Sequence, residues 1–147
     1  MKDSPILFYE SEFYIFSNFS SFVVEWRGKL WMTVEHAYQA SKFTDEMIQE
    51  EIRNARSADE AYRIAHRHEE KMDASLKSQK LEIMEDIIRA KITQHEYVQK
   101  KLRDSGEREI IEESYRDAFW GWGPNKDGQN NLGKIWMKLR NELKGTP

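Results

Sequence analysis

Residues 22–43 read FVVEWRGKLWMTVEHAYQASKF, and within them the side-chain pattern changes from strand-like to helix-like. The runs on either side of Arg27-Gly28 are rich in aromatic and β-branched side chains, which predicts a β-hairpin with a short turn. Thr33 is suited to be the N-cap of a helix that we expect to run to about Phe43. The stretch therefore predicts a small β element that leads directly into a helix.

Outward from this stretch, we expect one short strand before it and mainly helices after it. The apolar run Ile6–Tyr9 indicates the strand, and Phe16–Ser20 has the Ser and Asn residues of a tight turn. Residues 109–112 fit a short strand or an extended connection. Helices are expected at residues 45–56, from the capping box Ser57-x-x-Glu60, at residues 74–91, and from near His95, where Thr93-x-x-Glu96 matches a capping box, to about Gly106.

The last helix has the clearest pattern. One apolar stripe recurs there at spacings of three and four, formed by Leu132, Ile135, Trp136, Leu139 and Leu143. Together the elements predict an α+β fold that is predominantly helical. We expect a single domain over residues 1–147, in which a small N-terminal β-hairpin or sheet packs against a helical bundle.

Composition restricts the class of protein. Of the 147 residues, 33% are charged and 39% hydrophobic, which is typical of a globular chain. No apolar run approaches the roughly 20 residues of a membrane helix, and the net charge of −3 does not favour long nucleic acids. The chain has no Cys, and its four His show no ligand pattern, so we expect no metal site and a cytoplasmic location.

The helix after the hairpin carries the first candidate residues. Glu35 would lie in its first turn, where the helix dipole favours an ionised carboxylate that could stabilise a sugar cation or activate water. Lys42, two turns on, could bind phosphate or form a Schiff base at a sugar C1. His36 is expected to bind the substrate and could act there as an acid or base. Each has a plainer interpretation: a dipole-stabilising surface acid, a solvated lysine and a structural histidine.

A second group follows near residue 117. Asp117 precedes the indole of Trp120 by three residues, and Gly121 and Gly123 follow. Aromatic rings stack on bases, glycines bring backbone N–H groups close to phosphate, and Asp117 could bind ribose hydroxyls or polarise water. Alternatively, the rings are core anchors and the glycines form turns.

The third group is Asn130-Asn131-Leu132-Gly133, at the start of the last helix. Either asparagine would make a good N-cap. A helix N-terminus that points into a site would also bind phosphate, and the two roles are compatible.

These segments together resemble the NADAR family, whose YbiA-like members have a mainly helical α+β fold. The matching pieces occur in the family's order, from about residue 7 to residue 143: Phe16–Phe19, Trp31–Phe43, Arg89–Lys91, Asp117–Gly123 and Asn130–Arg140. The resemblance implies N-glycosidase activity without a metal or a cofactor. The family's important carboxylates correspond to Glu35 and Asp117, its indole to Trp120 and its helix lysine to Lys42.

The resemblance implies two substrate classes that share a ribose C1–N bond beside phosphate. Some members are similar to hydrolases of phosphoribosylamino-pyrimidine intermediates of the riboflavin pathway, and others look like enzymes that remove ADP-ribose from guanine in nucleic acid. This chain departs from many YbiA-like members at two positions, where Asp73 stands in place of an Arg and Leu76 in place of a Trp. The departure removes a phosphate fork and a stacking platform, and it puts the riboflavin-pathway substrate in question.

We therefore expect a small phosphorylated ribosyl substrate. Trp120 and Phe19 would stack on the base or frame the ribose, and Asn18, the loop glycines and the last helix would hold phosphate and hydroxyl groups. Glu35 and Asp117 would stabilise charge at C1, with attack either by water or by Lys42. The competing hypotheses are a nucleotide- or ADP-ribose-binding module without turnover, and a scaffold whose Trp residues all lie in the core.

Overall fold

The computed structural model describes residues 4–7 and 11–145. Their contacts divide the chain into two compact units. The first, here called the central unit, is Asn18–Gln94, and the second, the terminal unit, combines Met1–Ser17 with His95–Pro147. The single domain expected over residues 1–147 stays a prediction at this level.

The central unit begins with the predicted hairpin, which is confirmed. Strands β2 (Val24–Trp26) and β3 (Lys29–Trp31) pair antiparallel, with Val24 opposite Trp31. Arg27 and Gly28 both have positive φ, 52° and 79°, as a type I′ turn requires. Val24, Trp26 and Trp31 are buried because alternate side chains of each strand face the same side.

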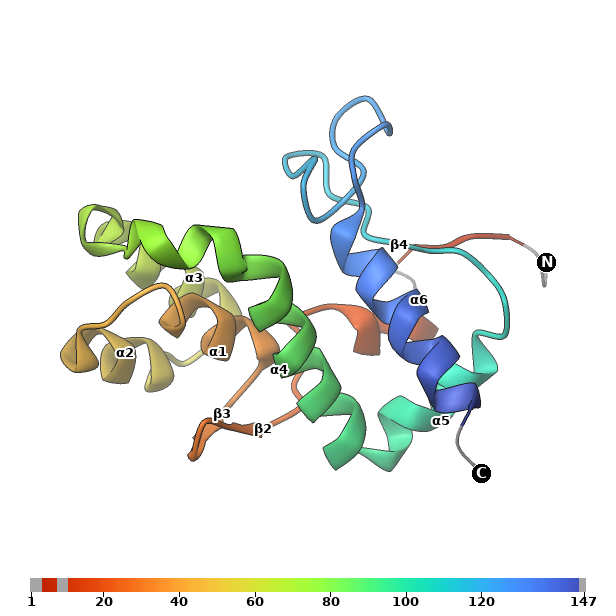
Figure 1. The fold of residues 1–147 in the computed structure, drawn as a ribbon, viewed down its shortest axis with the longest axis horizontal. Coiled ribbons are helices and arrows are strands. Elements are labelled where there is room, and N and C mark those ends of the chain that lie inside the picture. Colours follow the sequence, from red (N-terminus) through yellow and green to blue (C-terminus); the bar gives the residue numbers. More distant parts are fainter. Residues whose placement is uncertain (1–3, 8–10, 146–147) are drawn as a thin grey trace. The chain divides into compact units, whose positions relative to one another are not determined.

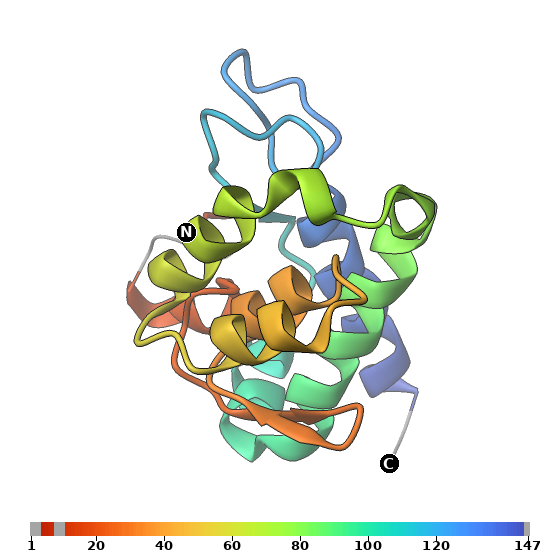
Figure 2. The ribbon, with the colours of Figure 1, turned by 90° about the vertical axis from the view of Figure 1, so that its left-hand side faces the viewer.

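Helices make up the rest of the central unit. These are α1 (Val34–Ala40), α2 (Glu46–Arg53), α3 (Ala58–Arg67) and α4 (Lys80–Gln94), with the 3₁₀ segments η2 (Glu69–Lys71) and η3 (Ala74–Gln79) between α3 and α4. Helix α1 lies among α2, α3, α4 and the hairpin (Figures 1 and 2) and contacts all of them. Every one of its residues is buried. The helix that carries the first candidate residues is thus the core element of this unit.

Helix α1 ends three residues earlier than expected. Lys42 and Phe43 donate their backbone N–H groups to the carbonyls three residues back, those of Gln39 and Ala40. The last turn is therefore a 3₁₀ turn, which tightens the helix end and satisfies its carbonyls. The side chain of Thr33 caps the other end, as predicted.

Only one of the two predicted capping boxes begins a helix. Ser57 accepts a hydrogen bond of 3.0 Å from the backbone N–H of Glu60 at the start of α3, so this prediction is confirmed. The prediction for Thr93 is wrong, because α4 continues to Gln94 and α5 (Glu96–Asp104) begins after His95 without a side-chain cap. Burial of α4 up to Ile92 favours continued helix over the local capping signal.

In the terminal unit, β1 (Ile6–Leu7) pairs in parallel with β4 (Ile110–Ile111). The segment η1 (Ser11–Phe16), α5 and the long helix α6 (Asn131–Lys144) complete it. The predicted stripe on α6 is confirmed: Leu132, Ile135, Trp136 and Leu139 are buried, and the indole N–H of Trp136 donates to the carbonyl of Phe16 at 3.1 Å. None of the helices in the described ranges is long and apolar enough to cross a membrane.

Candidate functional site

Glu35 lies in the first turn of α1 and is 7% exposed. Its carboxylate accepts a hydrogen bond of 2.7 Å from the side-chain amide of Gln39, one turn further along the helix. Its backbone N–H donates to the carbonyl of Asn18 at 3.1 Å. These contacts hold a buried carboxylate in one orientation on the predicted face of the helix.

Two buried side-chain amide oxygens in the central unit accept no hydrogen bond from the described residues. Asn18 donates to the sulfur of Met84 at 3.5 Å, and its buried Oδ1 accepts no hydrogen bond from the residues that the structure describes. The same holds for the buried Oε1 of Gln39, whose amide nitrogen is bound to Glu35. Buried oxygens of this kind are rare in native proteins and mark places where a hydroxyl group or water completes the hydrogen bonding.

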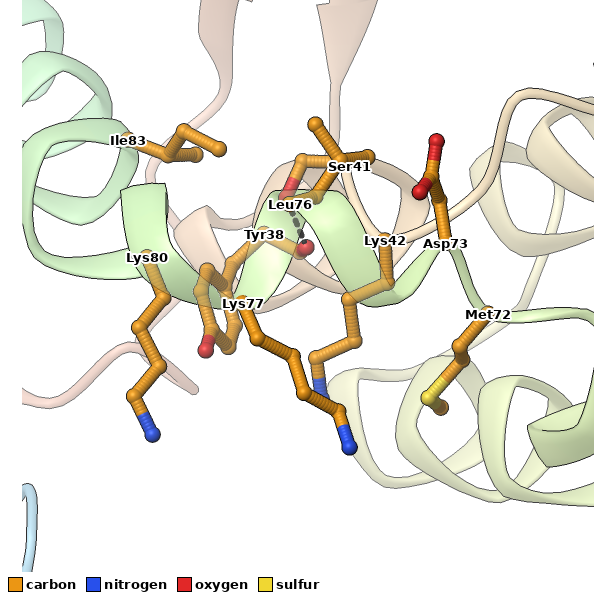
Figure 3. Close-up of a pocket in the computed structure, with 9 residues that line it drawn as sticks. All are labelled: Tyr38, Ser41, Lys42, Met72, Asp73, Leu76, Lys77, Lys80 and Ile83. Carbon is orange, nitrogen blue, oxygen red and sulfur yellow. Dashed lines mark hydrogen bonds between the residues drawn. The ribbon is translucent and has the colours of Figure 1, made fainter.

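Lys42 follows α1 and is half-buried, with its ammonium 5.0 Å from the centre of the Tyr38 ring. Both side chains line a cavity of about 250 Å³ within the central unit (Figure 3). The two departures from the family pattern, Asp73 and Leu76, line the same cavity. The other lining residues are Ser41, Met72, Lys77, Lys80 and Ile83.

Sequence reasoning missed Tyr38, Lys77 and Lys80 as candidates. Lys77 and Lys80 are three residues apart at the junction of η3 and α4, a spacing that puts both on one side of a helix. Lysines at that spacing are common on solvent-exposed helix faces, so the sequence alone did not indicate a binding role for this pair. The structure shows that both lysines line the same cavity as Lys42.

His36, predicted as a substrate-binding residue, is fully buried. Its Nδ1 is hydrogen-bonded to the Thr33 hydroxyl at 2.7 Å and its Nε2 to the carbonyl of Ala55 at 3.0 Å. Burial lowers the pKa of this imidazole, which favours its neutral form. With both ring nitrogens engaged, His36 connects α1 to the segment between α2 and α3, and its role is structural.

Phe19 is different, because it is 41% exposed and lies in the loop that precedes the hairpin. An exposed ring of this size next to Asn18 is compatible with the predicted contact to a base or ribose. That role stays a prediction.

In the terminal unit, the carboxylate of Asp117 organises its own loop. Its Oδ1 accepts hydrogen bonds from the backbone N–H groups of Phe119, at 2.9 Å, and Trp120, at 2.7 Å. The rings of Phe119 and Trp120 meet edge to face, with their centroids 4.8 Å apart. Asp117 and Trp120 are thus held close together, and their predicted roles toward a substrate remain predictions.

The glycines of this loop have structural reasons of their own. A Cβ at Gly121 would lie 2.6 Å from the carbonyl oxygen of Glu112, and Gly123 has a φ of 72° with Ala118 at 2.8 Å from its Cβ position. Gly133 packs in the same way against the carbonyl of Ile110 and the side chain of Asn130. Close packing within the protein explains these glycines without a ligand.

Asn130 stands at the N-cap position of α6, but its side chain makes no capping hydrogen bond. The amide instead donates to the carbonyl of Ile110 at 2.9 Å and accepts from the N–H of Glu112 at 2.9 Å. The expectation of a side-chain cap from Asn130 is wrong, because these two backbone groups take up both ends of its amide. Its φ of 51° is left-handed, a conformation that Asn tolerates well.

One further buried cation lies in the central unit. Lys91 is fully buried and donates to the hydroxyl of Ser20 at 2.9 Å. Burial lowers its pKa from 10.5 to about 7.

No cluster of three or more His, Asp or Glu side chains that could hold a metal ion occurs among the described residues.

Comparison with known proteins identifies the family. The NADAR domain model matches residues 7–144. The chain is 36% identical to the N-glycosidase YbiA of Shigella boydii over 97% of this chain and 91% of that protein. It is 34% identical to an N-glycosidase of Nostoc punctiforme, over 88% and 85% of the two chains, and 34% identical to a riboflavin biosynthesis protein of Vibrio vulnificus, of which it spans 40%.

The fold agrees with this relationship. The NMR structure of Escherichia coli YbiA superposes with a TM-score of 0.87 at 35% identity, covering 98% of this chain and 87% of that one. The predicted α+β, mainly helical fold is therefore confirmed, and so is the resemblance on which part of the site was predicted. The chain belongs to the NADAR family.

Proposed function

We propose that this protein hydrolyses the bond between ribose C1 and the nitrogen of a phosphoribosylamino-pyrimidine or a closely similar compound. The general class, a hydrolase of N-glycosyl bonds, follows from its identity with named N-glycosidases over almost the whole chain. The relative from Vibrio vulnificus, named as a riboflavin biosynthesis protein, supports this choice of substrate. The same homology favours an enzyme over a nucleotide-binding module without turnover.

The observation that carries the proposal is the environment of Glu35. Its carboxylate is buried, is oriented by Gln39, and shares the central unit with the unsatisfied oxygens of Asn18 and Gln39. Ribose hydroxyls are donors that would satisfy such oxygens. A carboxylate beside a bound ribose stabilises the positive charge that develops at C1 as the C–N bond breaks.

The nucleophile is either water or Lys42. In the first route, a carboxylate takes a proton from water as the water attacks C1. In the second, the amine of Lys42 attacks C1 and the base nitrogen leaves with a proton; the C1–O4′ bond then opens to give a Schiff base and a ring hydroxyl, and water hydrolyses the Schiff base to release the sugar and the free amine. Borohydride treatment during turnover separates the routes: reductive trapping of a sugar on Lys42 supports the second, and an active enzyme without any adduct supports the first.

Asp117 and Trp120 belong to the proposal as positions that correspond to family residues. Asp117 would add negative charge near the sugar, and Trp120 would stack on the base. The sharpest variant is Asp117→Asn, since an Asn oxygen can still accept from Phe119 and Trp120 while the charge is removed. If Glu35→Gln and Asp117→Asn both keep the full rate, this assignment of roles is wrong.

A paired assay tests the proposal. Purified protein is offered phosphoribosylamino-pyrimidine and, separately, ADP-ribosylated guanine in nucleic acid, and release of the base is measured. We expect turnover of the first, with kcat lower by about 10²- to 10⁴-fold in Glu35→Gln, the range for loss of one acid–base or charge-stabilising group. Equal base release by the wild type and Glu35→Gln would refute the mechanism.

The second substrate is the alternative that the departures at Asp73 and Leu76 favour. If the protein cleaves only ADP-ribosylated guanine, the same mechanism applies to that substrate class instead.

We also propose a cytoplasmic location, which the absence of Cys supports.

A further inference from the structure

The cavity of about 250 Å³ in the central unit has a cationic rim formed by Lys42, Lys77 and Lys80. We propose that Lys77 and Lys80 of this three-lysine rim bind the phosphate of the ligand, and that they take over the charge that an Arg in place of Asp73 would supply. The identity of the substrate rests on the proposed function, but the binding of a phosphate here does not.

The two walls of the cavity are joined by the backbone. Asp73, at the start of η3, donates its N–H to the carbonyl of Lys42 at 2.9 Å, so the segment that leads to α4 is fixed against the end of α1. The hydroxyl of Ser41 donates to the carbonyl of Tyr38 in the same wall (Figure 3). The backbone that carries Lys42 and the segment that carries Lys77 and Lys80 are therefore held next to each other.

The charge of the lining is strongly one-sided. The lining residues include three lysines and a single acidic residue, Asp73. The carboxylate of Asp73 already accepts hydrogen bonds from the backbone N–H and the hydroxyl of Ser75, at 2.9 and 2.6 Å. Figure 3 shows the ammonium ends of the three lysines extending to one side and the Asp73 carboxylate to the opposite side. The side of the cavity with the ammonium groups therefore presents positive charge that this acid does not neutralise.

The spacing of the side chains accounts for the replacement of the missing Arg. Lys77 and Lys80 are three residues apart, so they lie on one side of the η3–α4 segment, whereas Asp73 stands at the N-cap of η3 with its carboxylate on the opposite side (Figure 3). An acid at position 73 is compatible with an anion site here because Lys77 and Lys80, one and two turns further on, supply the cations. Lysines bind phosphate as point charges, whereas Arg binds it as a fork.

The remaining lining limits what fits. Tyr38 offers a phenol beside the lysines, while Leu76, Ile83 and Met72 form an apolar surface. A volume of about 250 Å³ lies below the roughly 300–1,000 Å³ of sites that enclose a drug-sized ligand. The cavity therefore suits a phosphoribosyl arm, or one phosphate of a longer ligand, with the base held elsewhere.

Binding measurements test the rim directly. The wild type, the double variant Lys77→Gln/Lys80→Gln and the control Lys71→Gln are titrated by calorimetry with ribose 5-phosphate, ADP-ribose and unphosphorylated ribose. Lys71 is an exposed lysine of the same unit that does not line the cavity. We expect the double variant to bind ribose 5-phosphate at least about tenfold more weakly, with ribose unchanged and the control equal to the wild type.

The titrations with ribose 5-phosphate and with ADP-ribose distinguish a monophosphate ligand from a diphosphate ligand. A tenfold loss for ribose 5-phosphate alone supports a monophosphate site, and an equal loss for ADP-ribose supports the same rim with a diphosphate ligand. Unchanged affinity for both, or an equal loss for unphosphorylated ribose, overturns the proposal. Raising the ionic strength should weaken ribose 5-phosphate binding to the wild type more than to the double variant.

Kinetics separate this inference from the proposed function. If the wild type cleaves the phosphoribosylamino-pyrimidine, the double variant should raise KM about tenfold and leave kcat within twofold. Turnover with unchanged KM and unchanged affinity refutes the rim but not the function. Absence of turnover together with loss of ribose 5-phosphate affinity in the variant refutes the function but not the rim.

Discussion

The face of α1 and the loop at residues 117–133 both carry several candidate polar residues, and the loop is also rich in glycine, yet the two regions use their polar groups differently. In the loop, the Oδ1 of Asp117 and the side-chain amide of Asn130 bond to backbone groups of the terminal unit, while the buried indole N–H of Trp122 has no hydrogen-bond partner among the described residues. On α1 and in the loop before it, Glu35 is oriented while oxygens of Gln39 and Asn18 remain unsatisfied. A high density of special residues thus accompanies local order, and a buried polar atom without a partner points to a bound group only where other groups of a site lie beside it, as Glu35 does beside Gln39.

Two asparagines give the largest expected contrast. Asn130→Gly keeps the left-handed φ but removes the hydrogen bonds that its amide makes to the carbonyl of Ile110 and the N–H of Glu112, which should cost about 2–4 kcal/mol of unfolding free energy. Asn18→Gly removes one weak bond to Met84 and should cost less than about 2 kcal/mol, part of it backbone entropy.

Urea denaturation measures both variants, and the KM of each completes the test. We expect Asn18→Gly to raise KM and Asn130→Gly to change mainly stability. The comparison between the two regions fails if Asn18→Gly is the more destabilising variant and leaves KM unchanged.

Asp117 provides a contrast of intermediate size. Asp117→Ala removes the acceptor for two backbone N–H groups and should cost about 1–2 kcal/mol, as loss of a helix cap does. Asp117→Asn retains an acceptor and should stay within about 0.5 kcal/mol of the wild type. Thermal melts of the two variants give the stability difference, and equal melting temperatures would show that the carboxylate does not organise the loop.

Lys91 gives an effect on stability that depends on pH. Its pKa is about 7 in the folded protein and near 10.5 when unperturbed, so between these values the unfolded chain binds more protons and stability rises with pH. The contribution of Lys91 to the slope of unfolding free energy against pH is at most about 1.4 kcal/mol per pH unit. Lys91→Met should remove it.

Unfolding free energies from urea denaturation, measured for both proteins between pH 7 and 10, check this prediction, since the other titrating groups are common to both. A difference between variant and wild type that does not change with pH would mean that Lys91 remains fully charged in the core. It would also show that the charge of Lys91 is stabilised by more than its hydrogen bond to the hydroxyl of Ser20.

Elements with a local cause were predicted well. The hairpin follows from a turn in which Gly28 allows positive φ, α3 follows from the hydroxyl of Ser57, and α6 follows from its apolar stripe. Predictions failed where a distant part of the same unit competes with the local signal. Thr93 does not start a helix because α4 stays buried past it, and Asn130 does not cap α6 because β4 takes its amide.

For the candidate site, the residues alone determined the acid in the first turn of α1, the lysine after it and the family to which both point. A motif of a few residues in one helix carries that information, because helix geometry sets which side chains share a face. Tertiary structure alone decided that His36 is structural, that Asn18 and Gln39 have oxygens to offer, and that Lys77 and Lys80 join Lys42 around one cavity. Burial and hydrogen-bond partners depend on segments that are distant in the chain, and no local pattern specifies which of them meet.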